Sequence, residues 1–203
     1  MGAQLQNRDY TIIVDKSGSM STTDVAGKSR YLAAQEGVEA LARKMQEFDP
    51  DGITVYPFAT YFKRYDNVTA EKVSQIFNEN EPNGGTNLHT VLDDALNSYF
   101  ARKAKGETKQ NGETIVVVTD GEPNDKVAVK TVIINATKKM ERDEELAISF
   151  LQIGKDQAAT VYLKSLDDDL VGQGAKFDIV DTVTQEESEG LTFTELLSKA
   201  ITD

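Results

Sequence analysis

The sequence contains no cysteine, no tryptophan and a single histidine. Without cysteine the chain forms no disulfide and carries no thiolate nucleophile. Zinc, which prefers sulfur and nitrogen ligands, is therefore a poor candidate, and one histidine cannot supply a paired-imidazole site. The absence of cysteine fits a reducing compartment, and we expect a cytoplasmic protein.

Positive charge is also scarce. The chain has 22 lysine and arginine residues against 34 aspartate and glutamate residues, for a formal net charge of −12. Binding to a phosphate backbone requires a basic face, so we expect no nucleic-acid partner. An acidic surface instead suits solubility, cations or a basic protein partner.

Long hydrophobic runs are missing as well. No apolar stretch approaches the roughly 20 residues that span a bilayer, and residues 1–9 contain no hydrophobic signal region. We therefore expect no membrane partner. A mean hydropathy of −0.43 over 203 residues fits a soluble protein with a substantial core. We expect one domain over residues 1–203, with its core at about 8–202.

What the sequence does contain is an alternation of short apolar runs and amphipathic segments. Apolar, β-branched runs predict strands, and apolar residues repeated every three or four positions predict helices. Strands are predicted at 9–14, 53–58, 61–65, 114–119, 147–153 and 177–180, and helices at 29–48, after Thr69, and at 88–103, 126–142, 156–166 and 191–201. This alternation implies βαβ units, hence an α/β fold with a mostly parallel sheet covered on both faces.

The first predicted strand ends in a polar turn. Asp15, Ser17 and Ser19 place one carboxylate and two hydroxyls at alternate positions, and Gly18 lets the backbone bend between the serines. Hard oxygens on a short loop suit Mg²⁺ or Mn²⁺ better than zinc. The same residue types also form helix N-caps and turns, so this stretch alone leaves both interpretations open.

Two further polar loops accompany this turn. Gly84-Gly85-Thr86 precedes a predicted helix, and Asp120-Gly121 follows the most hydrophobic predicted strand. Ligands of open α/β sheets bind outside the carboxyl ends of the strands, where the winding reverses. If the strands before Asp15 and Asp120 are neighbours there, both carboxylates face one point and Thr86 adds a hydroxyl. This donor set leaves room for water and one outside oxygen, as six-coordinate Mg²⁺ demands.

The three loops resemble the signature of a von Willebrand factor type A (vWA) domain with a metal-ion-dependent adhesion site (MIDAS). That signature is Asp-x-Ser-x-Ser on the first loop, a threonine on the second and an aspartate on the third. The sequence has DKSGSM at 15–20, GGT at 84–86 and TDGEP at 119–123. The resemblance covers nearly the whole chain and matches all five ligand positions, which are Asp15, Ser17, Ser19, Thr86 and Asp120.

The resemblance implies a doubly wound, Rossmann-like sheet of six strands in the order 3-2-1-4-5-6. One antiparallel edge strand is implied near residues 61–65. In its length and its simple single-domain organisation, the chain is similar to the small bacterial cytoplasmic members of the family, including those associated with tellurium resistance and stress.

The resemblance also implies the roles of the five residues. Ser17, Ser19 and Thr86 would ligate the metal directly, and Asp15 and Asp120 directly or through water. The cofactor would be Mg²⁺ or Mn²⁺, with Ca²⁺ as a further candidate. An aspartate or glutamate from a partner protein would fill the sixth position.

We therefore expect a non-enzymatic, metal-dependent protein-binding module of the adhesion or scaffold type. One alternative is a Mg²⁺-dependent hydrolase or phosphoryl-transfer enzyme with an aspartate nucleophile, and another is a scaffold subunit whose metal is purely structural. Against the enzyme, Gly27-Lys28-Ser29 lacks the upstream glycine of a phosphate-binding loop, since position 22 is Thr22. We expect His89, three residues after Thr86, to be an exposed or helix-capping residue.

Overall fold

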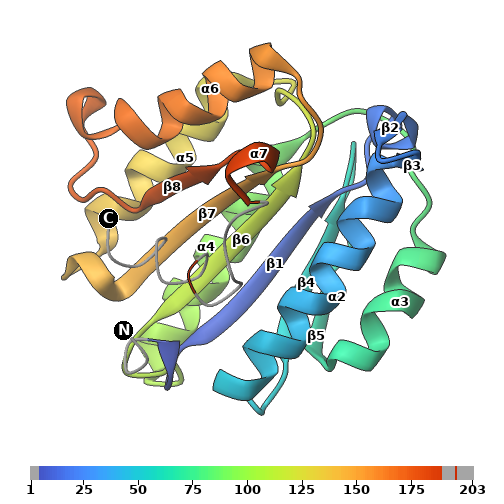
Figure 1. The fold of residues 1–203 in the computed structure, drawn as a ribbon. Coiled ribbons are helices and arrows are strands. Elements are labelled where there is room, and N and C mark those ends of the chain that lie inside the picture. The colour runs from blue at the N-terminus through green and yellow to red at the C-terminus, as the bar shows by residue number, and fades with distance from the viewer. Residues whose placement is uncertain (1–4, 189–194, 196–203) are drawn as a thin grey trace.

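Six strands of the computed structural model form a single sheet, with helices against both of its faces (Figure 1). The structure describes residues 5–188 and 195. The strands of this sheet are β1 (Asp9–Asp15), β4 (Ile53–Phe58), β5 (Tyr65–Val68), β6 (Glu113–Thr119), β7 (Leu146–Gln152) and β8 (Val180–Val183). Their order is β5-β4-β1-β6-β7-β8. Counted along the chain this is 3-2-1-4-5-6, which confirms the predicted order.

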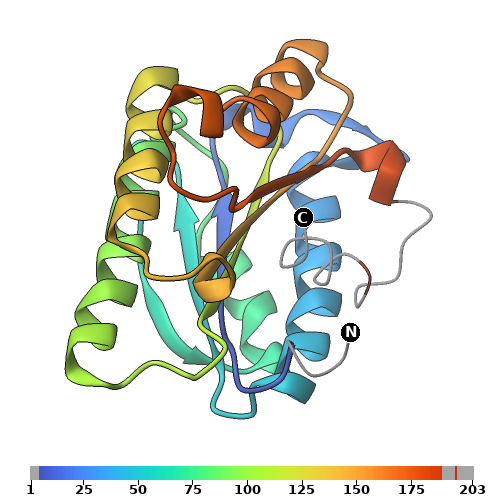
Figure 2. The same cartoon turned by 90° about the vertical axis from the view of Figure 1, so that its left-hand side faces the viewer.

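Within this sheet β5 pairs with β4 in the antiparallel direction, and the other neighbouring strands pair in parallel. Figure 2, turned by 90°, shows helices on both sides of the sheet. The helices are α2 (Arg30–Phe48), α3 (Ala70–Glu79), α4 (Leu88–Lys105), α5 (Lys126–Lys139), α6 (Gln157–Asp168) and α7 (Gln185–Ser188), with short 3-10 helices η1 (Gly18–Ser21), η2 (Asp143–Glu145) and η3 (Val171–Gln173). None of the described helices combines the length and apolar character needed to cross a membrane.

The central strands bury both of their faces. In β1, Ile13 packs into the cluster formed with α4, α5 and α6, whereas Ile12 and Val14 pack into the cluster formed with α2 and α3. In β6, Val117 and Val118 divide between the two clusters in the same way. Strands buried on both faces have continuous apolar sequences instead of alternating ones. This is why β1 and β6 are predictable from their apolar runs.

The edge strand predicted at 61–65 is displaced. The ladder between β4 and β5 places Tyr65 opposite Val55, so the strand begins where the prediction ends. Phe62 forms only an isolated bridge with Phe58, and the Tyr61 side chain is 84% exposed. The apolar character of the aromatic residues misled the prediction, because an edge strand tolerates polar residues on its exposed side.

The last strand is displaced too, and its predicted position at 177–180 is wrong. The observed strand β8 begins at Val180 and continues through Asp181 and Thr182, and all four of its residues are buried. A buried carboxylate and a buried hydroxyl interrupt the apolar run that predicts a strand. The predicted helices that fall within the described residues are found, although α5 ends at Lys139 because Met140 turns into the core with extended backbone angles. The helix predicted at 191–201 lies, except for Glu195, outside the described residues.

A small hairpin occupies the segment that sequence analysis leaves as a loop before α2. It consists of β2 (Thr23–Val25) and β3 (Lys28–Ser29), which pair antiparallel. Its turn residues Ala26 and Gly27 have φ angles of 49° and 78°, the left-handed region that tight two-residue hairpin turns require. Figure 1 shows the hairpin at the carboxyl end of β1, above the start of α2.

Asp167, near the end of α6, has a pKa that makes the stability of the fold depend on pH. Its Oδ2 accepts a hydrogen bond of 2.9 Å from the backbone amide of Thr182. Burial, reinforced by the nearby carboxylate of Asp181, raises the pKa of Asp167 from 3.8 to about 6. The folded state therefore holds this proton more tightly than the unfolded state does. The stabilisation is fully present below pH 4 and is lost as the pH rises through about 6.

Replacing Asp167 with asparagine tests this dependence. Asp167→Asn keeps an acceptor for Thr182 and removes the charge, so we expect a higher melting temperature at pH 7.5 and no gain at pH 4. Thermal unfolding followed by circular dichroism measures both values. Asp169→Asn removes the same charge from an exposed neighbour and serves as the control. An equal gain from Asp167→Asn at both pH values would contradict the assignment.

Candidate functional site

Three loops meet at the carboxyl edge of the central strands. β1 and β6 are parallel neighbours, with Val14 opposite Val118, so Asp15 and Asp120 follow adjacent strands, as predicted. From β1 the sheet continues to β4, and from β6 it continues to β7 on the other side. The winding therefore reverses between these two strands, which is where open α/β sheets bind ligands.

Asp15 joins the first loop (residues 15–20) to the third loop (residues 119–123). Its side chain is fully buried. Oδ1 accepts a hydrogen bond of 2.7 Å from the Ser17 amide, and Oδ2 accepts one of 2.7 Å from the Thr119 hydroxyl. Burial raises the pKa of Asp15 to about 6, although these hydrogen bonds act in the opposite direction. Both carboxylate oxygens are thus held by protein donors.

Next to Asp15, side-chain oxygens of Ser17, Ser19 and Asp120 form a hydrogen-bonded row, which we call the oxygen row. The two serine Oγ atoms are 3.0 Å apart, and the Ser19 hydroxyl donates to Asp120 Oδ1 at 2.9 Å. Ser17 and Asp120 are buried, whereas Ser19 is exposed. The oxygen row therefore joins the first loop to the third and opens to solvent at Ser19.

The second loop (residues 84–86), which carries Thr86, is hydrogen-bonded to the first loop and to Asn124, the residue after the third loop. The Gly18 amide donates to the Gly84 carbonyl at 3.0 Å. Asn124, just after the third loop, donates its amide to the Thr86 carbonyl at 2.9 Å and accepts from the Thr86 amide through Oδ1 at 3.3 Å. Thr86 is 9% exposed. The structure thus places all five predicted residues on loops that are bonded to one another.

Sequence analysis misses one charged residue of this site. Arg30, at the start of α2, donates from Nη1 to Asp120 Oδ2 at 2.8 Å. The same guanidinium donates from Nε to Asp24 Oδ1 of the hairpin at 3.0 Å. The hydrogen bond with Asp24 raises the pKa of Arg30 above its ordinary value, and the bond with Asp120 acts in the same direction. No local pattern predicts this contact, because Arg30 and Asp120 are 90 residues apart.

His89 differs from its expected setting. It is half-buried on α4, and the N-cap of that helix is Asn87. The His89 side chain is therefore neither exposed nor a cap. Its Nδ1 atom is buried and has no hydrogen-bond partner within the part of the chain that the structure describes.

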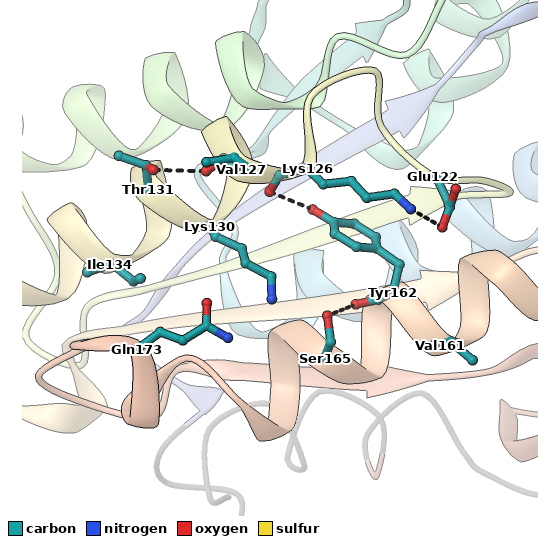
Figure 3. A pocket seen from close by; sticks show the side chains of 10 residues that line it. All are labelled: Glu122, Lys126, Val127, Lys130, Thr131, Ile134, Val161, Tyr162, Ser165 and Gln173. Carbon is teal, nitrogen blue, oxygen red and sulfur yellow. Dashed lines mark hydrogen bonds and ion pairs between the residues drawn. The ribbon is translucent and has the colours of Figure 1, made fainter.

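A groove of about 600 Å³ runs between α5 and α6 (Figure 3). At one end, Lys126 forms an ion pair with Glu122 of the third loop. The hydroxyl of Tyr162 lies 3.5 Å from the Lys126 carbonyl, and Val127 and Val161 border the groove with largely exposed side chains. The groove thus begins beside the third loop, and both apolar and polar side chains line it, including Ile134, Lys130 and Gln173.

Solved structures of other proteins share the fold of this chain at low sequence identity. A mutant of the PilB minor pilin from Streptococcus sanguinis aligns with a TM-score of 0.67 and 16% identity over 96% of this chain and 61% of the pilin. The pilus adhesin SpaC from Lactobacillus rhamnosus GG aligns with a TM-score of 0.63 and 14% identity over 96% of this chain and 30% of the adhesin. The manganese-loaded TRAP protein from Plasmodium vivax aligns with a TM-score of 0.55 and 18% identity over 91% of this chain and 71% of TRAP.

These structural similarities establish the fold, and the chain spans less than two thirds of the pilin and of the adhesin. No curated protein sequence matches the chain. The model of the von Willebrand factor type A domain matches residues 10–122, which run from β1 through the third loop. Because this match covers more than half of the sequence, the chain belongs to the von Willebrand factor type A domain family.

Proposed function

We propose that the three loops bind a divalent metal ion, Mg²⁺ or Mn²⁺ with Ca²⁺ as a third candidate, and that the ion holds an acidic side chain of a partner protein. The observation that carries this proposal is the oxygen row. Ser19 lies within hydrogen-bond distance of both Ser17 and Asp120, at the edge of the sheet where ligands bind. The row opens to solvent at Ser19, from which a partner approaches.

The donor set fits such an ion. The five proposed ligands, Asp15, Ser17, Ser19, Thr86 and Asp120, offer only oxygen atoms, which Mg²⁺ and Mn²⁺ prefer. Two are carboxylates and three are neutral hydroxyls. An ion with only two anionic ligands still attracts a third anionic ligand strongly. A carboxylate of another protein would supply that ligand. The ion would add positive charge beside two carboxylates that have Arg30 as a neighbouring cation.

The comparisons support a role in binding rather than in catalysis. Two of the similar structures are a pilin and a pilus adhesin, and the TRAP structure is manganese-loaded. A non-enzymatic adhesion or scaffold module is therefore our proposal for this chain. The cytoplasmic location and the stress-associated bacterial subfamily remain predictions from the sequence.

Metal binding is tested by removing one neutral ligand. Thr86→Ala deletes a hydroxyl without changing charge, and we expect the affinity for Mn²⁺ to fall by about tenfold or more. Isothermal titration with MnCl₂ measures the change. Thr90→Ala is the matched control, because Thr90 lies in the first turn of α4, four residues after Thr86, and its hydroxyl donates to the Asn87 carbonyl. Equal Mn²⁺ affinities for wild type and Thr86→Ala would contradict the ligand assignment.

Partner binding is tested by affinity capture from the source lysate. We expect proteins that bind immobilised wild type in Mg²⁺ to be lost in EDTA and with Thr86→Ala, and to be retained with Thr90→Ala. Capture that is unaffected by EDTA and by Thr86→Ala would rule out a metal-held partner.

Two further measurements separate the alternatives. A purely structural metal predicts that EDTA lowers the melting temperature strongly and reduces capture only in step with unfolding. A Mg²⁺-dependent enzyme predicts turnover in phosphatase and ATPase assays, whereas our proposal predicts none.

A further inference from the structure

Arg30 is held in a well-defined place beside the site. The side chain of Ser29 caps α2 by accepting from the Leu32 amide at 3.2 Å, and the Arg30 amide donates to the Thr22 carbonyl at 2.9 Å. These bonds fix the start of the helix against the hairpin. The Arg30 side chain, only 14% exposed, reaches from there to the third loop.

The guanidinium is shared between two carboxylates that differ in burial. The Asp120 side chain is 1% exposed and that of Asp24 is 39% exposed. Arg30 donates to Asp120 through one nitrogen, at 2.8 Å, and to Asp24 through two, with a shortest distance of 2.5 Å. Such forked geometry is characteristic of arginine and is not available to lysine. Arg30 therefore makes more hydrogen bonds to Asp24, on the hairpin, than to Asp120.

Gly154, in the loop after β7, borders the same guanidinium. A Cβ atom built at Gly154 would lie 2.9 Å from Arg30 Nε, and the glycine has a φ of +79°. A larger residue at this position would displace the arginine. Arg30 is therefore enclosed by the hairpin, the third loop and the loop after β7.

A buried carboxylate needs a counter-charge, and Asp120 receives one from Arg30. A divalent ion bound to the oxygen row would face this arginine across the same carboxylate. If the ion also binds Asp120, two cations would share one buried carboxylate, and like charges repel each other more in a partly buried site than in water. Asp24 offers Arg30 a second anionic partner outside the oxygen row, and the arginine already contacts it.

We propose that Arg30 is an internal cation that competes with the metal ion for Asp120, and that Asp24 draws it away, so that the pair sets the metal concentration at which the site loads. This inference rests on the proposed metal site. It assigns the hairpin a regulatory role, since the hairpin carries the carboxylate that shares Arg30.

The inference predicts changes of opposite sign at two residues that contact each other. Arg30→Met keeps an unbranched side chain and removes the charge, so we expect Mn²⁺ to bind about tenfold more tightly. Asp24→Asn leaves Arg30 to Asp120 alone, so we expect binding to weaken severalfold. Arg30→Lys keeps the positive charge and should bind Mn²⁺ within about threefold of wild type. Isothermal titration with MnCl₂ on the full chain measures all three variants.

The matched control is Lys28→Met, which removes the same charge two residues away, on strand β3 of the hairpin. Lys28 is exposed and pairs with Glu36 rather than with the site. We expect its Mn²⁺ affinity to stay within about twofold of wild type, because exposed charges are screened by salt. An equal gain from Lys28→Met and Arg30→Met would show a general charge effect and overturn the inference.

Melting temperatures separate competition from a merely structural role. In EDTA, Arg30→Met should melt below wild type, because Asp120 is left buried without its counter-charge. Saturating Mn²⁺ should then raise the melting temperature of this variant by more than it raises that of wild type. A destabilised variant that gains no more than wild type from Mn²⁺ would mean that Arg30 only supports the fold.

The outcomes also separate this inference from the proposed function. If wild type binds Mn²⁺ and Arg30→Met binds it equally or more weakly, the metal site stands and the competition is wrong. If neither protein binds Mn²⁺, both proposals fail. If only Arg30→Met binds at the concentrations tested, the competition is supported in its strongest form.

Discussion

The parallel pairing of β1 with β6 is the constraint on which the site depends. A slip of one residue in either strand would exchange its two buried faces, placing Ile13 in the cluster of Ile12 and Val14. The two hydrophobic clusters therefore hold the register, and the register brings Asp15 within hydrogen-bond distance of Thr119. Packing energy in the core thus determines the positions of polar atoms at the edge of the sheet.

Much of this arrangement is predictable from the sequence. Strands buried on both faces appear as uninterrupted apolar runs, so β1 and β6 and the loops that follow them are located within a residue. Ligands of such sheets bind where the winding reverses, and this rule predicts that Asp15 and Asp120 lie close together. The spacing of the serines and the position of Thr86 at a helix start complete the five residues. Their roles as metal ligands stay predictions.

The remainder depends on contacts that have no local pattern. Strand β8 contains the buried polar residues Asp181 and Thr182, so its apolar signal is interrupted. The hairpin before α2 depends on a turn in which Ala26 adopts a positive φ, a conformation that alanine rarely takes. Arg30 has an ordinary sequence context at a helix start, and its contact with Asp120 arises only when α2 packs beside the third loop.

The hydroxyl groups of Ser17 and Ser19 have a kinetic consequence for the site. A hydroxyl both donates and accepts, so the two serines bond to each other and Ser19 donates to Asp120, while hydroxyl lone pairs would remain available to a metal ion. At the two serines, the proposed metal-bound state would be reached by rotation about the Cβ–Oγ bonds. Such rotations occur within nanoseconds or faster. The slow step of loading would then be the shedding of water by the ion itself, which Mg²⁺ does reluctantly.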